Sequence, residues 1–341
     1  MSKEGNVTRR NFLKKSGVGL GSFGLGISSS GLHASAKDSE SPVIIPEKLS
    51  PREAWVMSIV RSGLEKENMV EGMIERIRIM SSYKPDIICL PEVFTYTTAK
   101  TAEEVPGPLT NSFSKAAKEI GSYIICPLHT KKNGKVYNSA VVIGRKGEIV
   151  GQYDKIHPVS VECEAGVSPG SYPPPVFKTD VGTIGIQICF DINWIEEWKS
   201  LKEQGAEIVF WPSAYPAGRN LQAYAWMFKY YVVGCSWRDP ATIYDMTGDL
   251  ISQSGQWQHW AFGALNLEKV FFEIANYSKR LNDIKKKYGR KVLITYLNDE
   301  DWVTLESRSP DVRVKDIYEE YELVPHWDYI KLETKLQDNY R

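Results

Sequence analysis

The chain has 341 residues, of which 42% are hydrophobic and 25% are charged, a composition typical of a globular protein. Lys plus Arg equals Asp plus Glu, and this balance argues against bulk nucleic-acid binding, which needs a basic surface. The length is sufficient for one large hydrophobic core.

The first 36 residues resemble a twin-arginine export signal. The motif T-R-R-N-F-L-K at residues 8–14 precedes a modestly apolar stretch rich in Gly and Ser, and A-S-A at 34–36 resembles a small-residue cleavage site. The stretch is too short and too rich in glycine for a stable membrane span. We therefore expect the twin-arginine machinery to export the protein to the periplasm or the extracellular space, with residues 37–51 as a linker. A disordered basic tail or a nucleic-acid arm is the alternative.

Strands and helices alternate after the linker. Strands are predicted at 53–60, 85–92, 123–129, 182–189, 207–212 and 231–236, helices at 66–83, after Pro108, at 194–204 and at 221–229, and hairpins before Lys155 and at 247–249. This order indicates an α/β fold with two helical layers around a central pair of sheets.

Three residues with catalytic potential stand where predicted strands or hairpins end. Cys189 follows the apolar run 184–188, Glu92 ends the run 85–92, and Lys155 follows a hairpin. Because the ends of strands in an open α/β sheet converge at one edge, these side chains can share a site. Singly, they would be a core cysteine, a solvated acid and a surface cation. Together, in this order, they indicate a catalytic centre.

The motifs around these residues resemble those of the nitrilase superfamily of carbon–nitrogen hydrolases. They read P-E-x-F at Glu92, Y-D-K-I-H at Lys155 and I-C-F-D at Cys189, and the similarity extends to Asn138, Ser139, the run E-A-G-V-S-P-G at 164–170, Glu196 and the run G-A-E-I-V-F-W-P-S-A at 205–214. The similarity covers roughly residues 52–275. It implies a four-layer α-β-β-α sandwich whose dimer has eight layers.

The resemblance implies a role for each residue of the catalytic set. Cys189 is the nucleophile, and Glu92 is the general base and later the general acid. Lys155 stabilises the negative oxygen of the tetrahedral intermediate, and the backbone N–H of Phe190 is the natural second donor to it. The cysteine attacks an amide carbonyl, and water then hydrolyses the resulting thioester. No metal or organic cofactor is required.

The family carries a second glutamate after the lysine, which orients the site. Glu164, five residues before Pro169, is the better match here, and Glu162 is close enough to compete. We therefore expect Glu164 beside the catalytic lysine.

The residues after the cysteine favour a small-molecule amide as substrate. Nitrile-cleaving members typically have Trp-Glu there, whereas this chain has Phe190-Asp191, which favours an amidase or N-carbamoyl hydrolase. A nitrilase and an amide-transferring enzyme are alternatives within the superfamily. A non-catalytic binding or scaffold protein is a further alternative, against which the intact catalytic set argues. A cysteine protease needs a positioned histidine, and the family pattern already accounts for His157.

Several aromatic residues are candidates for the substrate pocket. Tyr96, Trp194, Tyr215 and Trp211 would suit an apolar or cationic substrate group, and ordinary core aromatics are the alternative. No basic pair near the site is evident for holding a substrate carboxylate, although Arg219 could serve.

Residues 276–341 differ in character from the hydrolase-like region. The segment 278–291 is strongly basic, and the tail mixes charged and aromatic residues. We expect an arm that packs across the subunit interface of a homodimer or higher homo-oligomer. A contact with a partner or the cell envelope through 285–287 is the alternative.

The five cysteines are Cys89, Cys126, Cys163, Cys189 and Cys235. No two form a C-x-x-C pair, so a zinc or redox site is not indicated. Folding in the reducing cytoplasm before export is expected to keep Cys189 free of disulfides.

Overall fold

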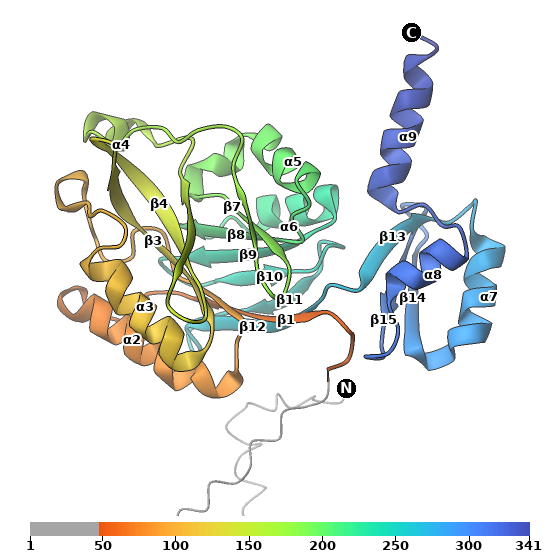
Figure 1. Ribbon diagram of the computed structural model, residues 1–341, viewed down its shortest axis with the longest axis horizontal. Helices are drawn as coiled ribbons and strands as arrows, with labels where there is room; N and C mark the ends of the chain where they lie inside the picture. Colours follow the sequence, from red (N-terminus) through yellow and green to blue (C-terminus); the bar gives the residue numbers. More distant parts are fainter. Residues whose placement is uncertain (1–47) are drawn as a thin grey trace, which may run out of the picture. The chain divides into compact units, whose positions relative to one another are not determined.

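Two six-stranded sheets form the centre of the fold (Figure 1). The computed structural model describes residues 48–341, so the expected signal and most of the expected linker lie outside the described residues. In spatial order the first sheet contains β12 (Trp260–Asn266), β1 (Glu53–Ile59), β2 (Ile87–Cys89), β3 (Tyr123–Lys132), β4 (Lys135–Ile143) and β5 (Ile149–Asp154). The second contains β11 (Leu250–Gln253), β10 (Thr242–Tyr244), β9 (Tyr231–Ser236), β8 (Ile208–Ser213), β7 (Thr183–Ile186) and β6 (Val176–Lys178).

Parallel strands occupy the middle of both sheets. β1, β2 and β3 are parallel in the first sheet, as are β7, β8 and β9 in the second. Such strands are buried on both faces, which explains their near-continuous apolar sequences. Glu92 follows β2 and Cys189 follows β7, so the topology brings both to the carboxyl ends of parallel strands.

Helices cover the outer face of each sheet. α2 (Met69–Met80) and α3 (Pro108–Ile120) share a core with the first sheet, and α5 (Ile195–Glu203) and α6 (Gly218–Phe228) share one with the second. A third core lies between the two sheets. The predicted α-β-β-α sandwich is therefore confirmed, although the helix expected at 66–83 is shorter because 3-10 turns flank it at both ends.

Polar contacts join the two sheets at β1 and β9. The sulfur of Cys235 lies 3.2 Å from the carbonyl oxygens of both Ile59 and Cys89, either of which can accept its one proton, and the hydroxyl of Ser58 donates to the carbonyl of Gly234 at 2.9 Å. These contacts satisfy buried groups and fix the position of β1 against β9.

The C-terminal region forms a folded module with a core of its own. A three-stranded sheet contains β13 (Lys269–Glu273), β15 (Trp302–Ser307) and β14 (Val292–Leu297), and α7 (Ser278–Tyr288) and α8 (Val314–Glu320) pack on it. The sequence predicted an extended arm from residue 276. The structure has a folded module there instead, and the module already begins with β13. The basic segment is largely α7, whose Leu281 and Ile284 are buried in that core.

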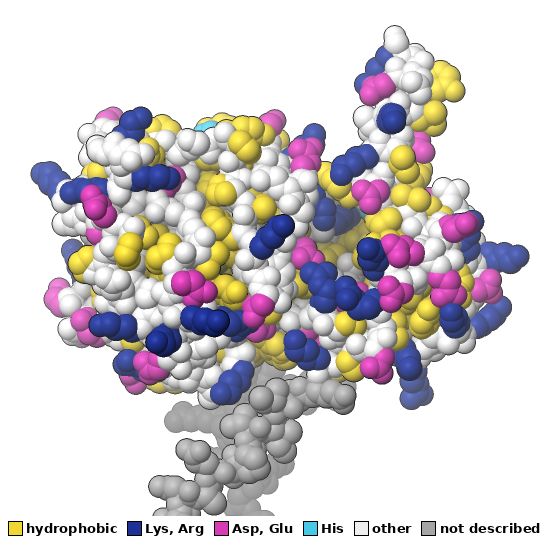
Figure 2. All heavy atoms as spheres, viewed as in Figure 1, with side chains coloured by type: hydrophobic (Ala, Val, Ile, Leu, Met, Phe, Trp, Pro, Cys, Tyr) yellow, Lys and Arg dark blue, Asp and Glu magenta, His cyan; other side chains and the backbone are white. Residues whose placement is uncertain are grey.

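The last helix, α9 (His326–Asp338), has no buried residue and exposes Ile330, Leu332 and Leu336. Figure 2 shows apolar side chains along this helix, and it shows cationic and anionic side chains interspersed over the visible face of the rest. None of the helices in 48–341 is long and apolar enough to cross a membrane. Within the same range, no group of three or more His, Cys, Asp or Glu is arranged to hold a metal ion.

Candidate active site

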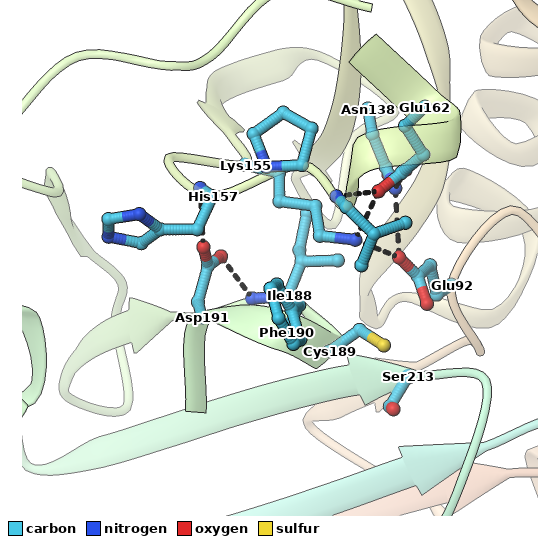
Figure 3. Close-up of polar contacts among 12 residues, drawn as sticks. Glu92, Asn138, Lys155, His157, Glu162, Ile188, Cys189, Phe190, Asp191 and Ser213 are labelled. Carbon is cyan, nitrogen blue, oxygen red and sulfur yellow. Dashed lines mark hydrogen bonds and ion pairs between the residues drawn. The ribbon is translucent and has the colours of Figure 1, made fainter. Parts of the chain in front are cut away.

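A network of four polar side chains forms the base of the site (Figure 3). The ammonium of Lys155, just after β5, donates to Oε1 of Glu92 and to Oε2 of Glu162, at 2.8 Å each. The amide of Asn138, on β4, donates to the same Oε1 of Glu92 at 2.8 Å and to Oε1 of Glu162 at 2.7 Å. The network fixes the two carboxylates on either side of one cation.

Lys155 is charged in this environment although it is buried. Burial by itself would lower the pKa of Lys155, but the carboxylates of Glu92 and Glu162 outweigh burial and raise the pKa above its usual value. The cation in turn holds the pKa of Glu162 below its usual value, against the opposing effect of burial. The site therefore presents a permanent positive charge near the cysteine.

Glu162, rather than Glu164, takes the place beside the lysine. It lies in the short helix α4 (Ser160–Glu164), and its Oε2 also accepts the backbone N–H of Val159 at 2.9 Å. Glu164, at the end of α4, is exposed and forms no hydrogen bond or ion pair with any residue in 48–341. The expectation that Glu164 would lie beside Lys155 is corrected: two residues along one helical turn point in different directions.

Cys189 begins a tight 3-10 turn (Cys189–Asn193) directly beyond β7. Its φ of 48° lies in the left-handed region, which a non-glycine residue occupies only where surrounding structure holds it. Figure 3 shows the sulfur directed to the same space as the Glu92 carboxylate and the Lys155 ammonium, with Ser213 on its other side. The sharp turn thus presents the sulfur at the end of the strand, as nucleophile turns do.

The thiol of Cys189 holds its proton in the resting site. Burial and the negative charge of Glu92 raise its pKa to about 12, against the opposing effects of Lys155, the Ala214 backbone N–H and the Ser213 hydroxyl. Both hydrogen bonds to Glu92 go to Oε1, so within 48–341 its Oε2 has no hydrogen-bond partner. That oxygen is free to accept the thiol proton.

A fully buried carboxylate holds the cysteine turn in place. Asp191 accepts the backbone N–H of Ile188 at 2.9 Å, the backbone N–H of His157 at 2.8 Å and the hydroxyl of Tyr153 at 2.7 Å. Burial raises the pKa of Asp191 to about 6, although these three hydrogen bonds act to lower it. Asp191 therefore joins the nucleophile's turn to the segment that carries the lysine.

Two tryptophans anchor the backbone of Cys189 and Glu92. The indole N–H of Trp211 donates to the carbonyl of Cys189 at 3.1 Å, and the indole N–H of Trp237 donates to the carbonyl of Glu92. Trp211, expected as a possible pocket residue, is fully buried and has this anchoring position instead.

The other predicted pocket residues lie at different distances from the chemistry. Tyr215 lies near enough that the charges of Cys189 and Glu92 act on its hydroxyl, although burial is the larger cause of its raised pKa. Trp194 stacks on the His157 ring at 3.7 Å and meets the Phe190 ring edge-on at 5.3 Å. Phe190, whose backbone N–H is the expected oxyanion donor, follows the cysteine directly.

Neither Tyr96 nor Arg219 forms a side-chain hydrogen bond or ion pair with the network residues described above. Tyr96 is 39% exposed, and its ring lies 4.2 Å from the guanidinium of Arg61, which also lies 3.9 Å from the Trp237 ring. Arg219, at the start of α6, lines a separate cleft of about 430 Å³, whose lining includes none of the four network residues or the cysteine. The structure therefore does not bring Arg219 to the catalytic residues.

The segment that contains the site matches a known protein family. The model of the carbon-nitrogen hydrolase family matches residues 57–270, which include every residue of the network and the cysteine. The chain belongs to the carbon–nitrogen hydrolase family. Within this family member, the matched segment ends where the C-terminal module begins.

Two curated relatives of this carbon–nitrogen hydrolase family member are amidases. A deaminated glutathione amidase from Mus musculus is 27% identical over 195 residues, which is 50% of this chain and 60% of the relative. An omega-amidase from Xenopus tropicalis is 31% identical over 144 residues, 38% of this chain and 51% of the relative. The chain thus spans between 51% and 60% of the lengths of these two relatives.

Solved structures share the fold of this family member. Nit3 of Saccharomyces cerevisiae, a member of the nitrilase superfamily, has a TM-score of 0.56 at 19% identity, covering 64% of this chain and 92% of that one. An amidase from Nesterenkonia sp. AN1, with the acetamide moiety of fluoroacetamide added covalently at its active-site cysteine, has a TM-score of 0.56 at 15% identity, covering 72% of this chain and 98% of that one. At such identities the likeness establishes the fold alone.

Sequence reasoning missed several positioning residues of this family member. Asp191 stood inside the quoted motif I-C-F-D, and an acid between apolar residues at a strand end is a signal that it is buried and bonded. Glu197, not the exposed Glu196, is the buried acid of α5, and it bonds His157 Nε2 at 2.9 Å. Nothing in the sequence indicated a role for Trp237, because its hydrogen bond to the Glu92 carbonyl depends on where β9 ends in space.

Proposed function

We propose that this protein hydrolyses a small, non-peptide amide through a cysteine thioester. The observation that carries the proposal is one charged network: Lys155 between Glu92 and Glu162, with the strained Cys189 turn presenting its sulfur to the same space. This arrangement offers a nucleophile, a proton acceptor and a fixed cation, as acyl transfer requires.

The first step forms the thioester. Sulfur of Cys189 attacks the amide carbon while Oε2 of Glu92 takes the thiol proton, so the thiolate exists only as the new bond forms. The carbonyl oxygen gains negative charge, which the Lys155 ammonium and the Phe190 backbone N–H stabilise. Glu92 then gives its proton to the leaving nitrogen, and the C–N bond breaks.

The second step hydrolyses the thioester. A water molecule gives a proton to Glu92 and attacks the acyl carbon, and the same two donors stabilise the second tetrahedral intermediate. The C–S bond breaks, the carboxylic acid leaves, and the proton on Glu92 returns to the sulfur. Glu162 acts as a positioning residue, because it holds Lys155 and Asn138 without reaching the sulfur side of Glu92.

The relatives support an amide substrate, since two of them are named as amidases. The covalent adduct in the Nesterenkonia amidase supports a covalent intermediate on the cysteine. An N-carbamoyl compound would react by the same steps, because it carries the same amide carbon and nitrogen.

We also propose that the protein is exported by the twin-arginine route. The motif at residues 8–14 and the small residues at 34–36 support it. Replacing Arg9 and Arg10 by Lys should retain the protein in the cytoplasm on cell fractionation, whereas replacing Lys14 and Lys15 by Arg should not. Equal export of both variants contradicts the proposal.

Ammonia release from a panel of amides, N-carbamoyl amino acids and nitriles tests the reaction. The native protein should hydrolyse an amide or carbamoyl compound. Cys189→Ala should lower turnover by about 10⁴-fold or more, as removal of a nucleophile does. Mass spectrometry of quenched reactions should show the acyl group on Cys189.

The matched control is Cys163→Ala, which removes the exposed thiol next to Glu162 without touching the nucleophile. It should keep turnover within about twofold of native, and both variants should keep the native circular dichroism spectrum. Full activity in Cys189→Ala, or a labelled peptide that lacks Cys189, contradicts the mechanism.

A further inference from the structure

Two lysines on the side of the second sheet lack an acidic partner. Lys229, the residue after α6, has a φ of 52° and is only 8% exposed, and within 48–341 its ammonium forms no hydrogen bond or ion pair. That ammonium lies 2.9 Å from the ring centre of Trp226 and 4.6 Å from that of Phe271. Lys202, in the last turn of α5, donates to the backbone carbonyl of Lys229 at 2.9 Å.

Burial of these two cations is costly without a counter-charge. Burial lowers the pKa of Lys229 to about 7, and Glu300 offsets this only in part. Burial likewise lowers the pKa of Lys202 to about 8, with Glu207 and Asp328 as the opposing charges. A protein that buries cations normally pairs them with an anion.

The start of α9 adds donors to the same region. Nδ1 of His326 and Nε1 of Trp327 are buried, and neither has a hydrogen-bond partner in the described chain. The Trp327 ring meets Phe228 of α6 at 6.4 Å, and burial together with the charges of Lys229 and Lys202 lowers the pKa of His326 to about 4. The ring is therefore neutral at pH 7 and carries one N–H.

The first turn of α9 is also uncapped. No side chain caps it, and the residue before it is Pro325. The backbone N–H groups in the first turn of a helix have no partner within that helix. The start of the 13-residue α9 therefore carries partial positive charge. The two ammonium groups, the indole N–H and this helix end are all hydrogen-bond donors, and within 48–341 the Lys229 carbonyl, which accepts from Lys202, is the one acceptor bonded to the lysine ammonium groups or the indole.

We propose that these groups, the Lys202–Lys229–His326–Trp327 cluster, bind a small tetrahedral oxyanion of the inorganic phosphate or sulfate type. Such an ion offers several acceptor oxygens to donors that come from three helices. It also supplies the counter-charge that the two lysines lack. This site is separate from the catalytic network, and none of its residues has a role in the proposed hydrolysis.

Titration of the purified full chain with phosphate or sulfate at constant ionic strength, against chloride, tests the proposal. Calorimetry should give saturable binding of one ion per chain. At a phosphate concentration tenfold above Kd, the melting temperature should rise by about 2–4 °C. Lys229→Met and Lys202→Met should each abolish the rise, and Lys229→Arg should keep it.

Lys199→Met is the matched control, because Lys199 lies on the same helix as Lys202 but is exposed and paired with Glu203. It should respond to phosphate as the native protein does. The same response in Lys229→Met and in native protein would mean an adventitious ion only, and would overturn the proposal. So would no response in native protein combined with a loss of oligomer mass in Lys229→Met by light scattering, since an acidic group of a second copy would then occupy the cluster.

Discussion

The protonation state of Cys189 decides how the proposed reaction begins. Its pKa of about 12 results from burial and the nearby Glu92 carboxylate, and the Lys155 cation offsets these effects only in part. A preformed thiolate would lie beside that carboxylate, and the two charges would repel. The resting pair is therefore a neutral thiol and a carboxylate, which makes Glu92 necessary for every attack.

This state predicts the ultraviolet difference spectrum between native protein and Cys189→Ala. Thiolate absorbance assigned to Cys189 should be absent at pH 7 and should not reach half its full value below pH 10. The reason is that half of a thiol is ionised only when the pH equals its pKa, and the thiolate fraction falls about tenfold for each pH unit below that. A thiolate step near pH 7 contradicts the prediction, and Cys163→Ala controls for the exposed thiol.

The geometry at α4 predicts different effects of two neighbouring glutamates. Glu162→Gln keeps the shape but removes the charge that holds Lys155, so kcat should fall by about 10²-fold, as for a displaced catalytic group. Glu164→Gln should leave kcat and KM within about twofold of native. Ammonia-release kinetics and melting temperature check both. Equal losses, or a loss in Glu164→Gln alone, would contradict the role given to Glu162 as the glutamate that holds Lys155.

At the scale of the element, the cysteine turn depends on one buried carboxylate. Asp191 accepts hydrogen bonds from the Tyr153 hydroxyl in β5 and from the backbone N–H groups of Ile188 and His157. Its pKa of about 6, against an ordinary 3.8, means that folding disfavours its ionised form by about 3 kcal/mol. The turn is thus held by a group whose charge is itself costly to bury.

Because the folded pKa of Asp191 is raised, the difference in free energy of unfolding between native protein and Asp191→Asn should depend on pH. The folded pKa is raised, so the native side chain's contribution to stability is fully present below about pH 4 and is lost as the pH rises through about 6. Asn has no such charge, but it leaves one backbone N–H without an acceptor at every pH. Between pH 4 and 7, the native protein's advantage in free energy of unfolding should therefore shrink by about 2 kcal/mol.

Urea unfolding of both proteins at several pH values measures this difference. The exposed Asp299→Asn serves as the control, and its difference from native should stay flat over the same range. A constant difference for Asp191→Asn would show that the pKa of the folded carboxyl is not raised, and would contradict the prediction.

The central strands could be predicted from the sequence because each is a short, continuous run of apolar residues. The run 184–188 and the E-I-V-F-W-P segment could only be buried strands, and their ends carry Cys189 and Ser213. The sequence could not separate Glu162 from Glu164, because α4 has only five residues and its orientation depends on the contact with Lys155. β14 and β15 were missed because charged residues border them, at 285–291 before β14 and at 299–301 between the two strands, so the segment as a whole resembled a charged tail.

At the scale of the whole molecule, α9 is a 13-residue helix that buries none of its residues against the described rest of the chain. Within it, Leu332 and Leu336 lie four residues apart on one face and are 57% and 52% exposed. An isolated helix of this length is marginal in water. We therefore propose, as the sequence suggested for this region, that α9 packs against a second copy of the chain.

This proposal predicts that Leu332→Asp combined with Leu336→Asp lowers the molecular mass measured by light scattering to that of one chain. Burial of each leucine contributes about 1.5–3 kcal/mol, and a charge at the same position opposes association. Thr334→Asp with Gln337→Asp adds the same charge to the same helix at exposed polar positions, so it should keep the native mass. Because α9 lies outside the segment that matches the hydrolase family, both double variants should keep the kcat of the native protein. A native protein that stays monomeric at every concentration, or equal masses for the two double variants, would show that the apolar face of α9 has another role.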